Sequence, residues 1–128
     1  MWNRIAIAIA IVLASAGIVK ADGAVAYVDV ANVGMSGSVV VNSASAGIAS
    51  EKAIANCRKS TRHSEVADRC KIVATLHRQC AVIVAGRRAS AWAVAGTAEE
   101  AERRATAKCK SVTDDCSRAT ELLCDTTE

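Results

Sequence analysis

The stretch Ala53-Ile54-Ala55-Asn56-Cys57 has a counterpart in Ala105-Thr106-Ala107-Lys108-Cys109, and this pair of alanine-rich segments marks an internal repeat. An apolar run precedes each segment. Each segment is also followed by two further cysteines, which are Cys70 and Cys80 in the first half and Cys116 and Cys124 in the second. The sequence therefore predicts two copies of one small unit, each with three cysteines.

Residues 1–21 have the pattern of a signal peptide, with a short positively charged start and an almost purely aliphatic run over 5–19. This run is shorter than the roughly 20 apolar residues that a membrane-spanning helix needs, which favours a cleaved signal over an anchor. Val19-Lys20-Ala21 places small residues at the recognition positions and predicts cleavage before Asp22. Ala14-Ser15-Ala16 is a second candidate site.

Residues 22–128 are expected to form a single secreted domain with two internal repeats, over about 23–80 and about 81–124. The whole chain carries a formal net charge of +3, with 16 Lys and Arg against 13 Asp and Glu. Arg4 and Lys20 belong to the signal, so its removal leaves +1. Such a small charge gives little support to general polyanion binding.

The chain has few large apolar side chains, because alanine fills most apolar positions and there is no Phe. A buried Ala contributes far less than the roughly 1.5–3 kcal/mol of a large apolar side chain. Small secreted domains with such a limited core commonly rely on disulfides. We therefore expect an interior that is marginally stable without its bridges.

The six cysteines are interpreted as three disulfides, since their number is even and no close pair of the zinc-binding kind is present. We expect neither a metal nor a cofactor. Equivalent positions in a repeat should have equivalent surroundings, so we predict the local bridges Cys57–Cys70 and Cys109–Cys116. Cys80–Cys124 would then join the two units, and the competing scheme pairs Cys57 with Cys80.

The pattern of apolar residues predicts an α+β fold. Strands are expected at residues 24–30, 38–42, 70–80, 81–85, 90–95 and 116–124, and helices from Ser45 or Ser50 to about Arg58 and from Thr97 to about Lys110. Thr97-Ala98-Glu99-Glu100 reads as a capping box. Cys70 and Cys80 share one face of their strand provided that no bulge interrupts it.

The fold class is accordingly two strand-strand-helix-strand repeats packed as one small disulfide-stapled domain. Its helices would pack against an antiparallel-rich sheet or against two small sheets.

The chain resembles a bacterial family of secreted proteins known as domain of unknown function 4189. The residues that carry the resemblance are Gly23 to Ala26, the alanine-rich helix ending in Cys57, Cys70 to Thr75, Gln79-Cys80, Ala91 to Thr97, Ala101-Glu102 with Ala105, Cys109 and Cys124-Asp125. They span nearly all of residues 22–128. The resemblance implies no activity, because the family has no established chemistry.

Basic residues gather in the first unit and the 86–89 hairpin turn, whereas the end of the second unit is acidic. This asymmetry suggests a surface for an anionic partner, such as an anionic protein or an envelope polymer. Its candidate residues are Arg58, Arg62, Arg78, Arg87 and Arg88. The near absence of aromatic residues disfavours single-stranded nucleic acid as the partner.

A second hypothesis is a small secreted nuclease-like hydrolase that uses His63, Glu65 and His77. These side chains would perform general acid–base work beside cationic arginines that stabilise phosphate. The competing interpretation is a solvated loop with two surface histidines. Convergence of His63 and His77 in a concave pocket would favour the enzyme.

The leading hypothesis is an exported, disulfide-stabilised small binding or inhibitor module without catalytic activity. It would act in the bacterial periplasm or outside the cell, with no membrane span after signal cleavage. The signal, the paired cysteines and the lack of a convergent polar site in the sequence support it.

Cleavage after Ala21 gives the first testable prediction. N-terminal sequencing of the exported protein should begin at Asp22, because the small residues at positions 19 and 21 fit the signal-peptidase pattern. An exported protein that retains Met1 would contradict the assignment.

Overall fold

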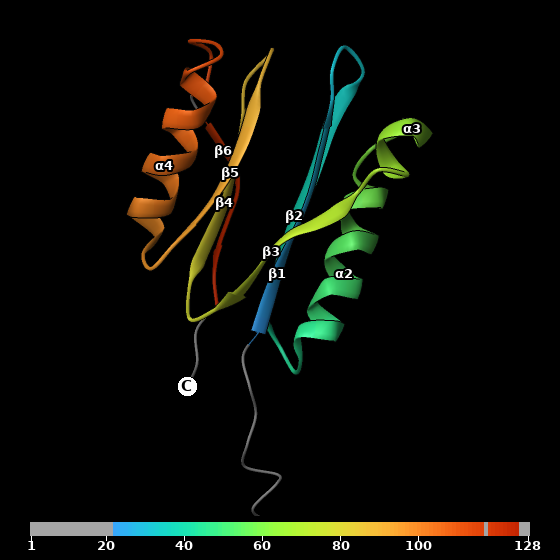
Figure 1. Cartoon of the computed structure of the whole chain (residues 1–128), viewed down its shortest axis with the longest axis vertical. Coiled ribbons are helices and arrows are strands. Elements are labelled where there is room, and N and C mark those ends of the chain that lie inside the picture. The colour runs from blue at the N-terminus through green and yellow to red at the C-terminus, as the bar shows by residue number, and fades with distance from the viewer. Residues whose placement is uncertain (1–21, 117, 126–128) are drawn as a thin grey trace, which may run out of the picture.

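The computed structural model describes residues 22–116 and 118–125, so the predicted signal peptide 1–21 lies outside the described residues. The described chain forms four layers, in the order helix, sheet, sheet, helix (Figure 1). Two antiparallel three-stranded sheets face each other, and a helix covers the outer face of each. This arrangement confirms the α+β fold class, in the form with two small sheets.

In the first sheet, β1 (Asp22–Val30) lies between β2 (Gly34–Ser43) and β3 (Lys71–His77). In the second sheet, β4 (Cys80–Ala85) lies between β5 (Ser90–Ala95) and β6 (Arg118–Cys124). Helix α2 (Ala46–Lys59), followed by the short α3 (Ser64–Ala67), belongs to the first unit, and α4 (Ala98–Lys110) belongs to the second. Both units therefore run strand, strand, helix, strand.

Alternation along β1 sends side chains to two different cores. Ala24, Ala26 and Val28 pack against α2 on the outer face. Val25 and Tyr27 belong to the cluster between the sheets. Because successive side chains of a strand point to opposite faces, a strand in the middle of a four-layer fold must be apolar on both.

The two helices present the same buried pattern, which explains the repeated alanine-rich motif. The buried residues are Ala49, Ala53 and Cys57 in α2 and Ala101, Ala105 and Cys109 in α4. Residues four apart lie on one helix face, and their small side chains let each helix approach its sheet closely. Ser45 and Thr97 cap the two helices by accepting a hydrogen bond from the N–H of Ile48 and Glu100.

The two sheets pack through one buried apolar cluster, whose fully or nearly fully buried members are Val25, Val39, Leu76, Ala81 and Ile83. Gly37 allows β2 to lie close to β4 at this contact. A Cβ atom built on Gly37 would lie 2.6 Å from the Ile83 Cδ1 atom. Any larger residue at position 37 would therefore push the sheets apart or force Ile83 to move.

A β-bulge interrupts the third strand of each unit, and this corrects the expected facing of Cys70 and Cys80. On β3 the pairing passes from Ala74 to Ile72 and skips Val73. On β6 it passes from Glu121 to Ala119 and skips Thr120. An extra residue reverses the alternation, so Cys70 packs towards α2 whereas Leu76 faces the second sheet.

The prediction of a single strand over 70–80 is also wrong at its C-terminal end. Strand β3 ends at His77, Arg78 adopts a left-handed conformation with φ of 58°, and Cys80 begins β4. The chain thus crosses from one sheet to the other between His77 and Cys80.

All six cysteines form disulfides, and the pairing is the predicted one: Cys57–Cys70, Cys80–Cys124 and Cys109–Cys116. The Cα atoms are 6.1, 3.9 and 5.9 Å apart in that order. The place of Cys80–Cys124 differs from the expectation, because both residues belong to the second sheet and are cross-strand partners there. This bridge closes one unit and does not join the two.

The first sheet carries a histidine–carboxylate contact, which is an ion pair whenever His77 is protonated, where the second carries that disulfide. In the first sheet, the cross-strand pair Gly23 and Leu76 is followed at the end of the strands by Asp22 and His77. In the second sheet, the pair Ala81 and Leu123 is followed in the same way by Cys80 and Cys124. The His77 Nδ1 atom lies 3.2 Å from the Asp22 Oδ1 atom. The two units therefore use different chemistry at the same structural position.

The double variant D22C/H77C is predicted to form a fourth disulfide, since its side chains would take the places that Cys80 and Cys124 take in the second sheet. A bridge over a loop of this length stabilises a domain by about 2–4 kcal/mol. Thiol titration of the unfolded, non-reduced protein should find no free thiol, and thermal denaturation should show a raised midpoint. The control D22S/H77S removes the ion pair without adding a bridge and should not be stabilised. Free thiols in the cysteine variant would contradict the equivalence.

Candidate functional site

Four of the five predicted basic residues lie towards one end of the sandwich. Arg87 and Arg88 lie at the β4–β5 turn, Arg58 lies at the end of α2, and Arg62 follows it. We call this end, which also carries the β1–β2 turn, the hairpin end; it is the upper end in Figure 1. Arg78 lies at the opposite end, between β3 and β4.

Acidic partners neutralise part of this basic set. The Arg58 guanidinium lies 3.4 Å from the Asp68 carboxylate, and that of Arg87 lies 3.5 Å from the Asp115 carboxylate. Both pairs are solvent-exposed, so each contributes little to stability. Within residues 22–116 and 118–125, Arg62 and Arg88 have no ion-pair partner and are exposed.

The structure does not bring the three predicted hydrolase residues together. His63 precedes α3 at the hairpin end, close to Gly34. His77 ends β3 at the other end and contacts Asp22. The strand between these ends spans about 20 Å at its usual rise per residue. Glu65 contacts Arg69 at 3.5 Å, and no metal-binding group of three or more His, Cys, Asp or Glu residues occurs in the described chain.

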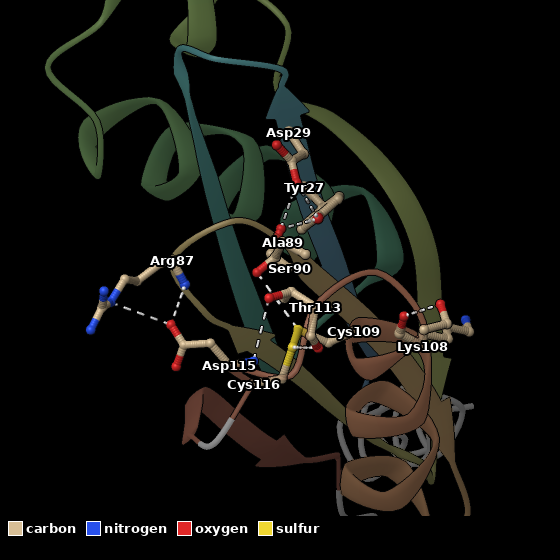
Figure 2. The surroundings of a disulfide bond; sticks show 11 residues. Tyr27, Asp29, Arg87, Ala89, Ser90, Lys108, Cys109, Thr113, Asp115 and Cys116 are labelled. Atoms are coloured by element: carbon tan, nitrogen blue, oxygen red, sulfur yellow. Dashed lines mark hydrogen bonds and ion pairs between the residues drawn. A yellow bond between two sulfur atoms is a disulfide. The ribbon is translucent and has the colours of Figure 1, made fainter.

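Polar side chains from both units meet where the start of β5 faces β1. We call these three side chains, Tyr27, Asp29 and Ser90, the seam cluster. Figure 2 shows the three side chains directed towards one another. The Ser90 hydroxyl donates to the Asp29 carboxylate at 2.8 Å and also contacts the Tyr27 hydroxyl. The Tyr27 hydroxyl lies 3.4 Å from the same Asp29 oxygen atom. The cluster therefore connects the two sheets by hydrogen bonds.

Sequence reasoning missed this cluster. Ser90 lies 63 residues from Tyr27, and nothing in its local sequence distinguishes it from other exposed serines. Only the packing of the two sheets brings the hydroxyl to the carboxylate.

Burial raises the pKa of Tyr27 above its ordinary value of 10.0, and the negative charge of Asp29 raises it further, against the lowering effect of the Ser90 hydrogen bond. Tyr27 is thus a neutral hydrogen-bond donor at physiological pH and not a phenolate base. The seam cluster contains no histidine to take a proton from Ser90. The arrangement is suited to binding and orientation more than to proton abstraction.

Two surface hollows share Tyr27 as a wall. The first has a volume of about 260 Å³ and is lined by Tyr27, Ser90, Ala91, Trp92 and Lys108. The second has a volume of about 460 Å³ and is lined by Tyr27, Val28, Asp29, Val30, Arg69 and Lys71. Each hollow thus combines an aromatic side chain with at least one cation.

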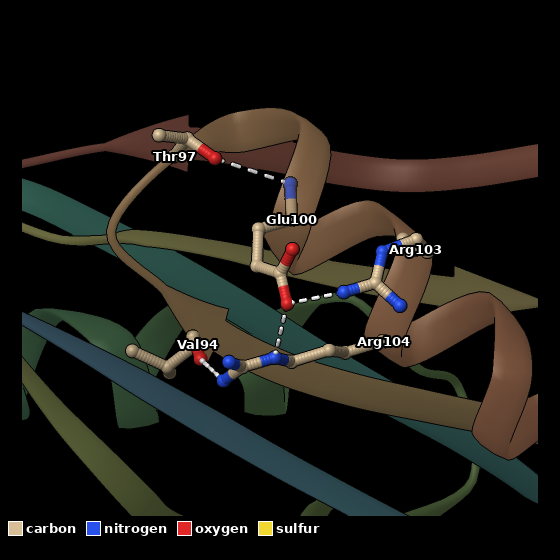
Figure 3. Close-up of polar contacts among 5 residues, drawn as sticks. All are labelled: Val94, Thr97, Glu100, Arg103 and Arg104. Atoms are coloured by element: carbon tan, nitrogen blue, oxygen red, sulfur yellow. Dashed lines mark hydrogen bonds and ion pairs between the residues drawn. The ribbon is translucent and has the colours of Figure 1, made fainter.

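Helix α4 covers the free edge of β5 with two cations. Lys108 Nζ donates to the carbonyl of Trp92 at 3.3 Å and lies 5.1 Å from the centre of the Trp92 ring. Arg104 donates to the carbonyl of Val94 at 3.4 Å, as Figure 3 shows. These two carbonyls belong to the edge of β5 that has no strand beside it.

Glu100 organises the start of α4 differently from the predicted capping box. Thr97 caps the helix as expected, but the Glu100 carboxylate contacts Arg103 and Arg104 at 2.5 and 2.8 Å (Figure 3). Hydrogen bonds from these two arginines hold the pKa of Glu100 below its ordinary range. Glu100 thereby orients Arg104 towards the edge of β5.

Asp125, part of the Cys124-Asp125 motif, is a buried carboxylate whose structural role was not predicted from the sequence. It is 2 % exposed and accepts hydrogen bonds from the backbone N–H groups of Asn42 and Arg78, at 2.9 and 3.0 Å. Both of those residues have a φ of 58°, an uncommon conformation for residues other than glycine. Asp125 therefore stabilises two left-handed backbone positions, one near the end of β2 and one between β3 and β4, at the end opposite the hairpin end.

The fold and its three disulfides define a small α+β protein, in which two disulfide-closed units pack sheet to sheet. The family model described as domain of unknown function (DUF4189) matches residues 22–123, and the chain belongs to this family. The resemblance found in the sequence is thereby confirmed. No curated protein and no solved structure matches the chain.

Titration of Tyr27 tests the environment of the seam cluster, because it is the chain's single tyrosine. An ultraviolet absorbance titration of the folded protein should show ionisation of the phenol above pH 10.0, the ordinary value. The Tyr27 phenol keeps its proton in the folded state at pH values at which it loses it in the unfolded state. The raised pKa therefore contributes to the stability of the fold, and this contribution is complete below the pKa of the unfolded state. It is then lost as the pH rises through the folded pKa.

Ser90→Ala is the matched variant for this titration. It removes the hydrogen bond that lowers the pKa of Tyr27, so the midpoint should move further upward. A midpoint at or below the ordinary value in the unaltered folded protein would contradict the buried position of the hydroxyl.

Proposed function

We propose that this protein is an exported, disulfide-stabilised binding or inhibitor module of the bacterial envelope or extracellular space, and that it works without catalysis. Its partner is an anionic protein or an anionic envelope polymer. The hairpin end and the adjoining seam between the sheets form the binding surface.

The observation that carries this proposal is the pairing of all six cysteines in three disulfides. Disulfides persist in oxidising compartments and are rare in the cytosol, so they indicate an extracytoplasmic location. No helix in the described part of the chain is long and apolar enough to cross a membrane. The predicted signal peptide agrees with this location.

The charge distribution supports an anionic partner. Arg62, Arg87 and Arg88 are exposed at the hairpin end, and Lys59 and Lys110 lie at or near the ends of the two helices that point the same way. Exposed cations gathered at one end attract an anionic partner and speed its association.

The nuclease-like alternative receives no comparable support. Its two histidines lie at opposite ends of the first sheet, and Glu65 contacts Arg69. A general acid and a general base must both reach the same substrate atoms. His63, Glu65 and His77 do not meet that requirement.

The proposal is tested by locating the protein and then measuring its binding. After expression of the full chain in bacteria, the protein should appear in the periplasmic or secreted fraction, with no thiol that reacts with maleimide before reduction. The purified exported protein should then be retained on immobilised dextran sulfate and not on neutral dextran, because its exposed cations attract the sulfate groups.

R87Q/R88Q should weaken this retention, since it removes two exposed cations of the hairpin end. R78Q is the control at the opposite end and should leave the retention nearly unchanged. A cytoplasmic protein with free thiols would overturn the proposed compartment, and equal effects of both variants would overturn the proposed surface.

A further inference from the structure

The two aromatic side chains of the described chain lie at one surface hollow. The protein has one tyrosine, no phenylalanine and two tryptophans, of which Trp2 lies outside the described residues. Tyr27 comes from β1 and Trp92 from β5, yet both line the hollow of about 260 Å³ at the seam. Neither element alone forms this site, which exists only because the two units pack together.

Filling the core explains only part of this placement, because Tyr27 and Trp92 pack against the cluster between the sheets without being fully buried there. The largest fully buried side chains are Leu76, Ile83 and several valines, whereas Tyr27 and Trp92 both stay half-buried. A core short of large side chains would gain most by burying its aromatics completely, since each offers a large apolar area. Each ring instead packs partly against the core and leaves part of its surface exposed at the hollow.

Cations surround the two rings. In the first hollow, Lys108 lies over the ring of Trp92. The second hollow is lined by Lys71 and Arg69 and also by Tyr27. Lys71 is exposed and has no ion-pair partner among residues 22–116 and 118–125. Arg69 contacts Glu65 at 3.5 Å, an exposed pair that a stronger anion can replace.

Hydroxyl groups complete the set of interactions. Ser90 and Tyr27 present hydroxyl groups at the seam cluster, beside the Asp29 carboxylate. A matching ligand has C–H faces that pack on the apolar ring surfaces and hydroxyl groups that bond to the hydroxyl and carboxylate groups. It also has negative charges that face the nearby cations. A sugar ring that bears a carboxylate has all three.

We propose that the two hollows that share Tyr27 bind successive sugar units of an acidic polysaccharide. Their volumes, about 260 and 460 Å³, lie around the lower end of the range of about 300–1,000 Å³ for small-molecule sites. Such hollows suit single sugar units of a chain better than the continuous face of a folded protein. This inference deepens the proposed function and rests on it for the compartment in which the polymer is met.

Nucleic acid is the less suitable polyanion. Each nucleotide carries a full charge, and proteins that bind it usually have strongly basic domains with an isoelectric point above about 9. The calculated isoelectric point here is about 8.6 for the whole chain, and loss of Arg4 and Lys20 with the signal lowers it. Residues 22–128 therefore lack the strongly basic character that is typical of nucleic-acid-binding domains.

Calorimetric titration of the exported protein with oligogalacturonate, a chain of uronic acid units, tests the proposal. Binding should be measurable with oligogalacturonate and absent with neutral dextran oligosaccharides of similar length. The variant K71Q/R69Q should bind about tenfold more weakly, because it loses two charge-assisted contacts. K52Q/R78Q, which removes two exposed charges that line neither hollow, is the matched control and should keep most of the affinity.

The aromatic wall is tested by two substitutions at one position. W92F keeps an aromatic ring and should retain most of the binding, whereas W92L keeps apolar bulk without a ring and should bind several-fold more weakly. Y27F removes only the hydroxyl and provides a second aromatic variant if W92L does not fold, as judged by thermal denaturation. Y27F should keep its ring contact and lose the part of the affinity that depends on the hydroxyl group.

Other outcomes separate this proposal from the broader one. Equal losses in K71Q/R69Q and K52Q/R78Q, or unchanged binding in W92L, would overturn the polysaccharide site. Binding to polyglutamate or to oligo(dT) as tight as to oligogalacturonate would overturn the choice of ligand class. In each of these cases an exported, oxidised protein that still binds dextran sulfate through Arg87 and Arg88 leaves the proposed function standing.

Discussion

The buried face between the two sheets is the contact on which the whole sandwich depends. Each disulfide lies within one unit: Cys57–Cys70 in the first, and Cys80–Cys124 and Cys109–Cys116 in the second. The described units are therefore joined by their backbone connection and by non-covalent packing. That packing requires Gly37 opposite Ile83, because a side chain at position 37 would occupy the space of the isoleucine methyl group.

Hydrogen bonds at the margin of this face fix how the sheets lie against each other. Apolar packing alone is not directional, whereas Glu121 accepts the backbone N–H of Val39 at 2.8 Å and Asp125 accepts that of Asn42. At the hairpin end, Ser90 and Asp29 provide a third such link. Bonds to the ionised carboxylates are stronger than neutral ones, so a core made largely of alanine and valine still has a defined geometry.

The parts of the fold that follow from local sequence were predictable, and those that depend on pairing between distant segments were not. The helix start at Thr97 follows from capping chemistry, which also limits the other start to Ser45 or Ser50, and the alternation of β1 follows from its side chains. The bulges at Val73 and Thr120 arise only when these strands pair with β1 and β4. The prediction also placed Cys80 on the strand of Cys70, because the local sequence does not show that the strand ends before the left-handed Arg78.

The candidate site was harder to predict than the fold, for the same reason. The basic residues of the hairpin end could be named from composition, but the sequence alone gave no way to tell that Arg78 lies at the other end. The seam cluster and the two aromatic side chains come from strands in different units, so their proximity depends on how the sheets pack. The two histidines, which are near in sequence, lie far apart because β3 separates them.

The cations of α4 also affect what the outer edge of β5 can bind. A strand edge with free carbonyls is a template for another chain, and edge-to-edge pairing of copies is a common route to aggregation. Here the carbonyls of Trp92 and Val94 already accept hydrogen bonds from Lys108 and Arg104. A second copy would have to displace both cations before it could extend the sheet, so the same helix that covers the core also protects the protein from fibril formation at this edge.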